Sequence, residues 1–470
     1  MSNEKQKILI VGAGGGREHA IGWKIAQPAR SEGGSFLKRE LFFARGNAGT
    51  AELGINLDIK ETEIQKLIDF AQKEKVDLTL ALSDDPLALG IVDEFQKAGL
   101  RIWGPSKAAS QLEWSKAFSK EFMRKNNLPT AKFEVFNDFE KAKEYIKRQA
   151  LPVVIKADGL ALGKGVTICD SIEKAEKTLE EIMVRKIFGD SGNEVIIEEF
   201  LIGPEISIHA FSDGKNYKMF PASQDHKKIR EGDVGPNTGG VGTITPLPFV
   251  SEELMTKIEK EIVAPTLEAM AREGKPYVGV LYPGLILTQE GPKILEYNAR
   301  FGDPETQVYV RILKNDLLEI IDASIDGKLN EINVEWEKDL AVCNIVLCSG
   351  GYPGSYEKGK IITGVDSPLE EYPRSGGGGQ NFSTPSLRAT PQEGNEIIVF
   401  HAGTKIIDTT INGLPAKALA AAGGRVLGVS ATAKTLPDAL LKAYKAIEKI
   451  SFEGMQYRKD IGKKALSLSK

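Results

Sequence analysis

Two lysines flank a short glycine-rich stretch in the second quarter of the 470-residue chain. Lys156 ends an apolar run over 151–157, and Lys164 follows in the loop between Gly163 and Gly165. Lysine ammonium groups bind phosphate, and a glycine loop can cover a bound triphosphate and then release it. The stretch predicts a triphosphate site, although a plain glycine turn with solvated lysines would have the same local sequence.

Acidic residues follow at the end of a second apolar run. Glu198 and Glu199 close a predicted strand over 194–200, Leu201 lies just beyond them, and Glu205 lies four residues further. The backbone at a strand end can pair with the edge of an adenine, and a carboxylate nearby can accept hydrogen bonds from ribose hydroxyls. Without the lysine loop, these residues would form an ordinary charged strand end.

A third pattern alternates polar residues over 296–300. On a strand, Glu296, Asn298 and Arg300 would share one face, because successive side chains point to opposite sides. Mg²⁺ takes a few protein oxygens together with substrate phosphates, and arginine makes planar, bidentate contacts with phosphate. This face fits a hard cation and a phosphate, and the alternative is chance alternation on a half-exposed strand.

A glycine cluster, Gly12-Ala-Gly-Gly-Gly16, lies between a predicted strand over 7–11 and a predicted helix over 17–27. Bare backbone N–H groups and a helix N-terminus at such a junction can bind an anion, although many such clusters form only a tight turn. A dinucleotide site would also need an acidic residue about 20 residues further on, after a second strand. That region is the polar stretch 29–39, so the cluster favours an anion over a nicotinamide cofactor.

The elements that position these residues alternate between strands and helices in the first part of the chain. Apolar runs over 7–11, 41–44 and 78–82 predict strands, and helical spacing appears over 64–75 and 87–98. This alternation is typical of a doubly wound parallel sheet, in which the carboxyl ends of the strands share one crevice.

The rest of the chain predicts a mixture of helices and antiparallel strands. We expect helices over 106–127, 172–186 and 436–450, a hairpin of strands 279–287 and 293–297, and short strands over 341–348, 397–401 and 425–430. The stretch 367–396 predicts an exposed flexible loop. We expect that replacing its segment 375–388 with a short linker changes activity and melting temperature little, since loop-closure entropy varies slowly with length.

Composition excludes several function classes. A formal net charge of −4 disfavours nucleic acid or an anionic membrane as the main partner. No run approaches the ~18 apolar residues of a membrane span, and the first residues lack a secretory apolar segment, so we expect a cytoplasmic protein. Three cysteines fit no disulfide framework, and four scattered histidines argue against a His/Cys metal cage.

The order of these patterns resembles the ATP-grasp superfamily. Within it, the chain resembles the glycinamide ribonucleotide synthetase (phosphoribosylamine–glycine ligase) family nearly from end to end. The most specific matching segments are Gly15-Gly-Arg-Glu-His-Ala20, Gly46-Asn-Ala-Gly-Thr50, Ile155-Lys-Ala-Asp-Gly-Leu160, Ser223-Gln-Asp-His-Lys227, Gly235-Pro-Asn-Thr-Gly-Gly240, Asn298-Ala-Arg-Phe-Gly-Asp-Pro-Glu305, Phe400-His-Ala-Gly-Thr-Lys405 and Tyr457-Arg-Lys-Asp-Ile-Gly462.

The resemblance implies a mixed α/β (α+β) chain with an ATP-grasp fold. We expect a doubly wound N-terminal substrate domain over 1–110, an ATP-grasp domain over 111–335 with a mobile lid at about 128–200, and a β-rich C-terminal domain over 336–470. The implied reaction belongs to de novo purine synthesis. Glycine is joined to 5-phospho-D-ribosylamine through glycyl phosphate, with ATP and Mg²⁺ (or Mn²⁺) as cofactors, and we expect a monomer.

The resemblance also implies roles for particular residues. ATP phosphates would contact Lys116 and Lys156 under a lid loop of Gly163, Lys164 and Gly165, with adenine at Glu198, Glu199 and Leu201 and ribose at Glu205. Glu296 and Asn298 would bind the metal. The implied catalytic residues are Arg300, Lys156 and Asp303, and the implied substrate-binding residues are Gly14, Gly15, Gly16, Asn47, Asp225 and Lys227. The four histidines would be structural.

The sequence departs from the family pattern mainly on the substrate side. The first glycine loop has one residue more than usual, Arg45 replaces a proline, and Leu82-Ser83-Asp84 replaces Gly-Pro-Glu. Because all three follow predicted strands of one sheet, we expect them to be neighbours, with Arg45 as a cation for the acceptor phosphate or, alternatively, as solvated surface. A ligase with a changed substrate and a nucleotide-binding protein without turnover stay open as alternatives.

Overall fold

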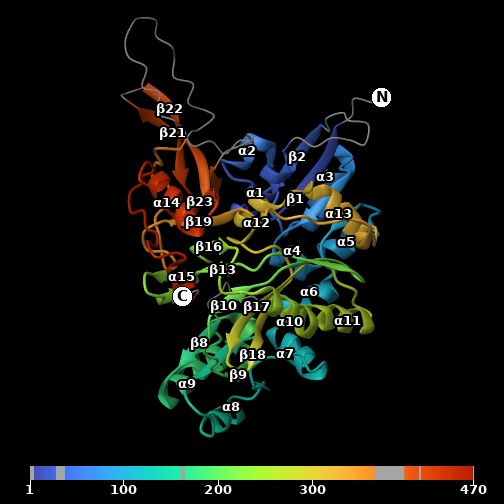
Figure 1. Cartoon of the computed structure of the whole chain (residues 1–470), viewed down its shortest axis with the longest axis vertical. Coiled ribbons are helices and arrows are strands. Elements are labelled where there is room, and N and C mark those ends of the chain that lie inside the picture. Colours follow the sequence, from blue (N-terminus) through green and yellow to red (C-terminus); the bar gives the residue numbers. More distant parts are fainter. Residues whose placement is uncertain (1–4, 28–37, 160–164, 366–395, 412–413, 469–470) are drawn as a thin grey trace, which may run out of the picture.

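The computed structural model describes residues 5–27, 38–159, 165–365, 396–411 and 414–468 (Figure 1). Most of the expected loop over 367–396 lies outside the described residues, as do Gly163 and Lys164. The other predicted site residues lie within them. Among the described helices, none combines the length and apolar character needed to cross a membrane.

The N-terminal region is a five-stranded sheet with the strand order β3-β2-β1-β4-β5, and all its pairs are parallel. Its strands are β1 (Gln6–Val11), β2 (Arg39–Ala44), β3 (Ile55–Leu57), β4 (Leu78–Ala81) and β5 (Ile102–Trp103). The central strand β1 forms from an unbroken apolar run, Ile8 to Val11, which is fully buried, as strands covered on both faces are. The predicted doubly wound parallel sheet is confirmed.

Helices connect and cover these strands. They are α1 (Gly16–Ile25), α2 (Thr50–Leu53), α3 (Ile64–Glu74), α4 (Asp84–Leu89) and α5 (Ile91–Lys97). The glycine cluster and the segment after Ala81 both follow the carboxyl ends of strands, so they share one edge of the sheet.

The helix predicted over 106–127 is two helices, α6 (Lys107–Trp114) and α7 (Lys116–Lys125). The break falls at Ser115, whose extended backbone ends α6, while its hydroxyl accepts a hydrogen bond from Phe118 N and caps α7. Serine suits this position because its side chain can replace the missing helical acceptor. The break places Lys116 at the first position of α7.

The middle of the chain holds two larger antiparallel sheets of four and five strands. One contains the predicted hairpin, β17 (Val278–Thr288) and β18 (Gly291–Asn298), with β10 (Glu205–Ser207), β11 (Ala210–Asp213) and β12 (Tyr217–Met219). The other has the order β6-β9-β7-β8, from β6 (Phe133–Phe136), β7 (Val153–Ala157), β8 (Val166–Cys169) and β9 (Val195–Glu199). The hairpin prediction is confirmed, with a β-bulge that inserts Leu295 opposite the step from Gly284 to Leu285.

Helices α8 (Phe139–Ile146) and α9 (Ile172–Leu179) pack on the β6-β9-β7-β8 sheet. The predicted helix over 172–186 is shorter than expected, since a π-helical turn over 180–184 replaces its last part and Arg185 N donates to Glu180 O. The remaining helices of the middle region are α10 (Glu252–Ile258), α11 (Ala264–Arg272), α12 (Thr306–Ile312) and α13 (Leu317–Ile325), and β14 (Lys228–Arg230) pairs with β15 (Val234–Asn237).

The C-terminal region is rich in strands, as expected. Its main sheet has the order β13-β16-β19-β23-β20, from β13 (Gln224–Asp225), β16 (Gly242–Thr245), β19 (Ala341–Cys348), β20 (Ile397–His401) and β23 (Arg425–Ala433). Helix α14 (Leu436–Ile447) packs on β19 and β23, α15 (Lys463–Leu468) ends the chain, and β21 (Thr404–Ile411) pairs with β22 (Leu414–Ala421). Two strands from before residue 246 thus join this sheet and bring Asp225 beside the C-terminal region (Figure 1).

Candidate active site

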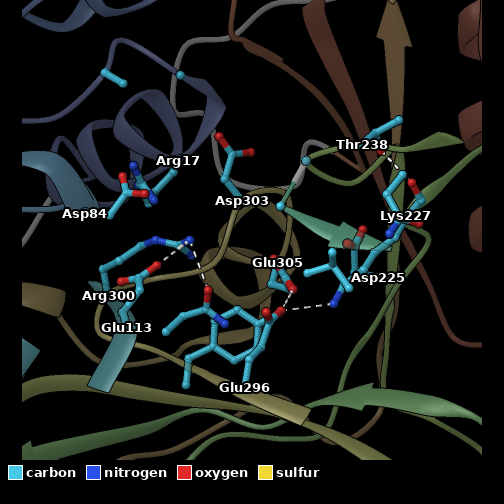
Figure 2. A pocket seen from close by; sticks show the side chains of 18 of the residues that line it. Arg17, Asp84, Glu113, Asp225, Lys227, Thr238, Glu296, Arg300, Asp303 and Glu305 are labelled. Carbon is cyan, nitrogen blue, oxygen red and sulfur yellow. Dashed lines mark hydrogen bonds and ion pairs between the residues drawn. The ribbon is translucent and has the colours of Figure 1, made fainter. Parts of the chain in front are cut away.

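A cavity of about 660 Å³ lies where the N-terminal, middle and C-terminal regions meet (Figure 2). Among the residues predicted from sequence, those that line it are Gly14, Gly15, Lys116, Lys156, Gly165, Asp225, Lys227, Glu296, Asn298, Arg300 and Asp303. We call Lys116, Lys156, Glu296 and Asn298 the lysine side of the pocket. We call Gly14, Gly15, Asp225 and Asp303 its glycine-loop side.

Six other predicted residues lie outside this lining: Gly16, Asn47, Glu198, Glu199, Leu201 and Glu205. Asn47 is buried behind the glycine loop, where its Nδ2 donates to Gly14 O at 3.1 Å, Gly15 O at 3.3 Å and His401 O at 2.9 Å. Its side chain therefore holds the loop in place and does not face the cavity.

The lysine side rests on a buried cluster of charges. The Glu198 carboxylate pairs with Lys156 and, at 2.6 Å, with Lys120 Nζ, which also donates to Thr130 Oγ1 at 2.7 Å. Burial lowers the pKa of Lys120 to about 8, against the opposing charge of Glu198. The Glu198 side chain is therefore occupied by lysines, and only backbone at this strand end is left for a nucleotide base. Lys120 was not predicted from the sequence.

Lys116 and Lys156, two of the lysines that line the cavity, each donate to a backbone oxygen. Lys156 Nζ donates to Leu295 O at 3.1 Å, and Lys116 Nζ donates to Gly159 O at 2.8 Å. The carbonyl of Leu295 is available because the bulge in β18 leaves this residue without a direct strand partner. The start of α7, the end of β7 and the bulge in β18 together direct the ammonium groups of Lys116 and Lys156 into the cavity.

Glu296 and Asn298 lie on one face of β18, as predicted. Lys227 Nζ contacts Glu296 Oε1 at 3.2 Å, and Lys227, followed by Lys156 and Lys116, lowers the pKa of Glu296 to about 2 despite burial. Glu296 is therefore a carboxylate at any physiological pH. In turn, Glu296 raises the pKa of Lys227, against burial.

The oxygens of Glu296 and Asn298 fit a hard divalent cation that takes its other ligands from phosphate and water. Gly284 lies directly opposite Glu296 in the hairpin and supplies no second carboxylate. Within the described ranges, no group of three or more His, Cys, Asp or Glu side chains could hold a metal ion. A cation at this place would thus need substrate phosphates to complete its coordination.

Arg300 does not lie on the strand, contrary to the prediction, because β18 ends at Asn298 and the chain then bends. Its guanidinium still reaches the same face, since Nη2 lies 3.2 Å from Asn298 Oδ1. The same nitrogen lies 2.8 Å from Oε1 of Glu113, whose Oε2 accepts from Ala299 N at 2.8 Å (Figure 2). Burial raises the pKa of Glu113, although Arg300 opposes this.

Glu113 was missed because it lies in α6, far along the sequence from Arg300 and outside every quoted motif. A single acidic residue in an amphipathic helix carries no signal of such a contact. Arg17 and Glu305 also line the pocket, and both belong to segments that match the family, so their signal was present in the sequence.

The glycine loop differs from the expected array of bare N–H groups. Gly15 N donates to Glu18 Oε2 at 2.7 Å, and Glu18 Oε1 accepts from Arg17 Nη2 at 2.8 Å. A carboxylate of the chain itself thus occupies the start of α1, neutralised by the neighbouring guanidinium. Gly14 has φ +70°, and a Cβ there would lie 2.0 Å from Arg45 O, so this position requires glycine.

Gly14 and Arg45 are neighbours, as expected, and the Arg45 side chain lies at the surface, the second of the two roles considered for it, and not in the pocket. Its Nη1 pairs with Glu61 at 3.1 Å, and Arg45 is not among the residues that line the cavity. The backbone of Arg45 has φ 55°, which proline cannot adopt. Asp84 follows β4 at the same edge of the sheet and does line the cavity.

The pKa values of two carboxyl groups on the glycine-loop side are shifted in opposite directions. Burial opposes the charge of Asp303, but Arg425 and Arg17 outweigh it and keep its pKa below the ordinary value. Burial and then Glu305 raise the pKa of Asp225 well above its ordinary value, against Lys227 and Arg425. Arg425 comes from the C-terminal region and lies outside the motifs from which site residues were predicted.

Sequence models of one family match most of the chain. The description is phosphoribosylglycinamide synthetase, with its N domain at residues 6–113, its ATP-grasp (A) domain at 114–306 and its C domain at 342–464. A phosphoribosylamine–glycine ligase of Caldanaerobacter subterraneus is 44% identical over 455 residues, covering 97% of this chain and 99% of the relative. One from Escherichia coli O6:H1 is 42% identical over 463 residues, covering 98% and 99%.

Solved structures agree with these matches. The crystal structure of a phosphoribosylamine–glycine ligase from Thermotoga maritima has a TM-score of 0.75 and 33% identity, covering 97% of this chain and 99% of that one. A biotin carboxylase domain of Hydrogenobacter thermophilus 2-oxoglutarate carboxylase, solved with MgADP, ADP and bicarbonate, has a TM-score of 0.68 at 16% identity, covering 97% and 92%. That likeness shows the shared ATP-grasp fold alone.

The family predicted from the sequence motifs, glycinamide ribonucleotide synthetase, is the matched family under another name. Three domain models match in order, and relatives above 40% identity align almost from end to end. The chain is therefore an ATP-grasp enzyme that belongs to the phosphoribosylglycinamide synthetase family.

Proposed function

We propose that this chain joins glycine to 5-phospho-D-ribosylamine, using ATP and releasing ADP and phosphate. The observation that carries the proposal is one pocket with two chemically different sides. The lysine side gathers ammonium groups and a low-pKa carboxylate, which suits a triphosphate with its cation. The glycine-loop side presents the carboxyl groups of Asp303, whose pKa is lowered, and Asp225, whose pKa is raised, and carboxyl groups in the pocket suit an amine substrate.

In this proposal, Lys116, Lys156 and the loop with Gly163, Lys164 and Gly165 hold the ATP phosphates. Glu198, Glu199 and Leu201 hold adenine, Glu198 through its backbone, and Glu205 holds the ribose. Glu296 and Asn298 hold Mg²⁺ or Mn²⁺, which when bound neutralises phosphate charge. Gly14, Gly15, Gly16, Asn47, Asp225 and Lys227 form or support the acceptor site.

The proposed reaction has two steps, phosphoryl transfer to glycine and then amide formation. A glycine carboxylate oxygen bonds to the γ-phosphorus, the bond from that phosphorus to the β-γ bridging oxygen breaks, and ADP leaves while Arg300 and Lys156 stabilise the moving phosphoryl group. The phosphoribosylamine nitrogen then bonds to the acyl carbon, the carbon–oxygen bond to phosphate breaks, and the nitrogen loses a proton to the departing phosphate or to water. Asp303, as a carboxylate, orients that amine.

We also propose that the chain works as a cytoplasmic monomer of three domains over 1–110, 111–335 and 336–470, with a lid at about 128–200. The support for the lid is that strands β6 to β9 form a separate four-stranded sheet. Its strand β7 carries Lys156 of the lysine side. Size-exclusion chromatography with light scattering at assay concentrations tests the monomer directly.

An ADP-release assay tests the function. We expect release that depends on glycine and phosphoribosylamine together, with glycinamide ribonucleotide as product by mass spectrometry. Release with another acid or amine in place of either substrate, and none with this pair, would establish a ligase with a changed substrate. Nucleotide binding without release under any condition would establish a protein without turnover.

A further inference from the structure

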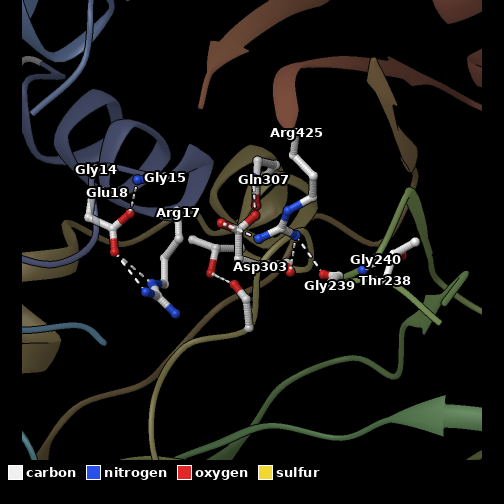
Figure 3. A network of polar contacts seen from close by, with 12 residues as sticks. Gly14, Gly15, Arg17, Glu18, Thr238, Gly239, Gly240, Asp303, Gln307 and Arg425 are labelled. Atoms are coloured by element: carbon white, nitrogen blue, oxygen red, sulfur yellow. Dashed lines mark hydrogen bonds and ion pairs between the residues drawn. The ribbon is translucent and has the colours of Figure 1, made fainter. Parts of the chain in front are cut away.

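Arg425, the first residue of β23, extends from the C-terminal sheet into the pocket (Figure 3). The strand that carries it is fixed by pairing with β19 and β20, and Ser349 N donates to Gly424 O just before it. The backbone is therefore rigid where this side chain begins. The sequence motifs that match the family do not include it.

The guanidinium of Arg425 contacts two separate segments of the glycine-loop side. Nη1 donates to Asp303 O at 2.6 Å and to Gly239 O at 2.5 Å, and Nη2 lies 3.2 Å from Asp303 Oδ2. A planar guanidinium with several donors suits such a junction, which a lysine could fill only in part. Its side chain is only 23% exposed, so little water competes for these contacts.

Asp303 is held on two sides. Gln307 Nε2 donates to its Oδ1 at 2.8 Å, while Arg425 takes Oδ2 and the main-chain oxygen. The carboxylate lies against the glycine loop, since a Cβ added to Gly15 would be 2.9 Å from Oδ2. Arg425 and Gln307 together thus hold this carboxylate in its place in the cavity.

The Gly239 peptide is also held at both ends by the C-terminal region. Its N–H donates to the Tyr352 hydroxyl at 3.0 Å, and its carbonyl accepts from Arg425. The adjacent Thr238 N and Oγ1 each donate to Lys227 O at 2.8 Å. Arg425 therefore supports both Asp303 and the segment that carries Lys227.

We propose that Arg425 is a positioning residue for the acceptor amine substrate, acting by holding Asp303 and the Gly239 peptide at the pocket. The proposal rests on the proposed function, since it names which substrate of that reaction depends on Arg425. The contacts of Arg425 described above all belong to the glycine-loop side and its supporting segment. Lys116 and Lys156 are held by other residues, so nucleotide binding does not depend on it.

Steady-state kinetics of R425Q and R425K tests this, with each substrate varied in turn and phosphoribosylamine formed in the assay from ribose 5-phosphate and ammonia. Hydrogen bonds to charged groups predict that R425Q raises the KM for phosphoribosylamine roughly tenfold to a hundredfold. The KM for ATP should stay within about twofold. R425K keeps the charge and should recover part of the loss.

Arg458 provides a matched control. It is a buried arginine of the same C-terminal region and pairs with Asp233 at 2.7 Å and Asp460 at 2.8 Å, but it does not line the cavity. R458Q should lower the melting temperature without changing one KM selectively. If R425Q behaves like R458Q, or raises all KM values equally, Arg425 is a structural clamp and the proposal is wrong.

A double variant and a fallback variant complete the test. The double variant R425Q/D303N should raise the KM for phosphoribosylamine much less than the product of the two separate increases, because Arg425 acts through Asp303. Independent, multiplying effects would contradict the proposal. If R425Q does not fold, R425K carries the test, with the same selective rise expected. Failure of the unchanged enzyme to release ADP with glycine and phosphoribosylamine would overturn the proposed function instead.

Discussion

The two sides of the pocket are built in different ways. On the lysine side, Lys116 begins α7, Lys156 lies in β7, and Glu296 and Asn298 lie in β18, so regular elements position every charged group. On the glycine-loop side, Gly14 and Asp303 lie in loops, Asp225 lies in a two-residue strand, and Arg425, from another region, supports them.

The difference shows how each side obtains its geometry. A strand or helix fixes the direction of its side chains by its own backbone, so the contacts on the lysine side act on groups that already point into the pocket. Loops have no regular backbone to fix the direction of their side chains. The glycine-loop side is instead held by hydrogen bonds from Asn47, Arg425 and Gln307. We therefore expect the lysine side to respond to loss of single charges, and the other side to loss of supports.

The largest effect should come from the lysine side. Lys156→Ala and Glu296→Ala should each slow turnover by roughly 10²–10³, or about 3–4 kcal/mol, because each removes a preorganised charge from the phosphate site. The measurement is kcat at saturating ATP and Mg²⁺, with circular dichroism to confirm folding. Glu290→Ala, at the exposed turn of the same hairpin, is the control and should match the parent enzyme. Near-normal rates in both variants would refute the assignment of this side.

A smaller effect should come from Glu113, which lies behind Arg300 and touches neither lysine. Glu113→Gln keeps the shape but removes the charge that holds the guanidinium, and should reduce kcat by about tenfold or somewhat more. The check is kcat with each substrate saturating, together with the ADP dissociation constant, which should stay unchanged. Weakened ADP binding with a normal kcat would place Arg300 among the nucleotide contacts instead.

The smallest effect on activity should come from the buried histidines near the glycine loop, which change stability instead. His401 N donates to His19 Nδ1 at 2.7 Å, and burial lowers the pKa of His401 and of His226 to about 4. Between about pH 6.5 and 4 the unfolded chain therefore binds more protons than the folded one, so stability falls as pH falls. Each such histidine should lower the free energy of unfolding by about 2 kcal/mol between pH 7 and pH 5.

Urea unfolding at pH 7 and pH 5 measures this loss. His401→Asn should show a smaller loss than the parent chain by about 2 kcal/mol, because it removes one titrating group. Equal losses in both proteins would mean that His401 takes up its proton in the folded state. None of the four histidines lines the cavity, so kcat at pH 7 should change little in this variant if the glycine loop keeps its place.

Much of the fold was predictable because its signals are local. The apolar run over 8–11 and the hairpin around β18 follow from residue periodicity, and both appear where expected. Ser115 shows the limit, since one serine ended a helix that the apolar spacing alone would continue. Arg300 shows a second limit, because β18 ends at Asn298, two residues before the end of the polar alternation over 296–300.

The sequence by itself determined the family, the place of the glycine cluster between β1 and α1, and the position of Glu296 and Asn298 on one face of a strand, because each is encoded by residues close together in the chain. Only the tertiary structure decided that Glu198 faces two lysines, that Arg45 turns to Glu61, and that Glu113 and Arg425 reach the pocket. The reason is physical: a buried charge must find its partner in space, and that partner lies at no fixed distance along the chain.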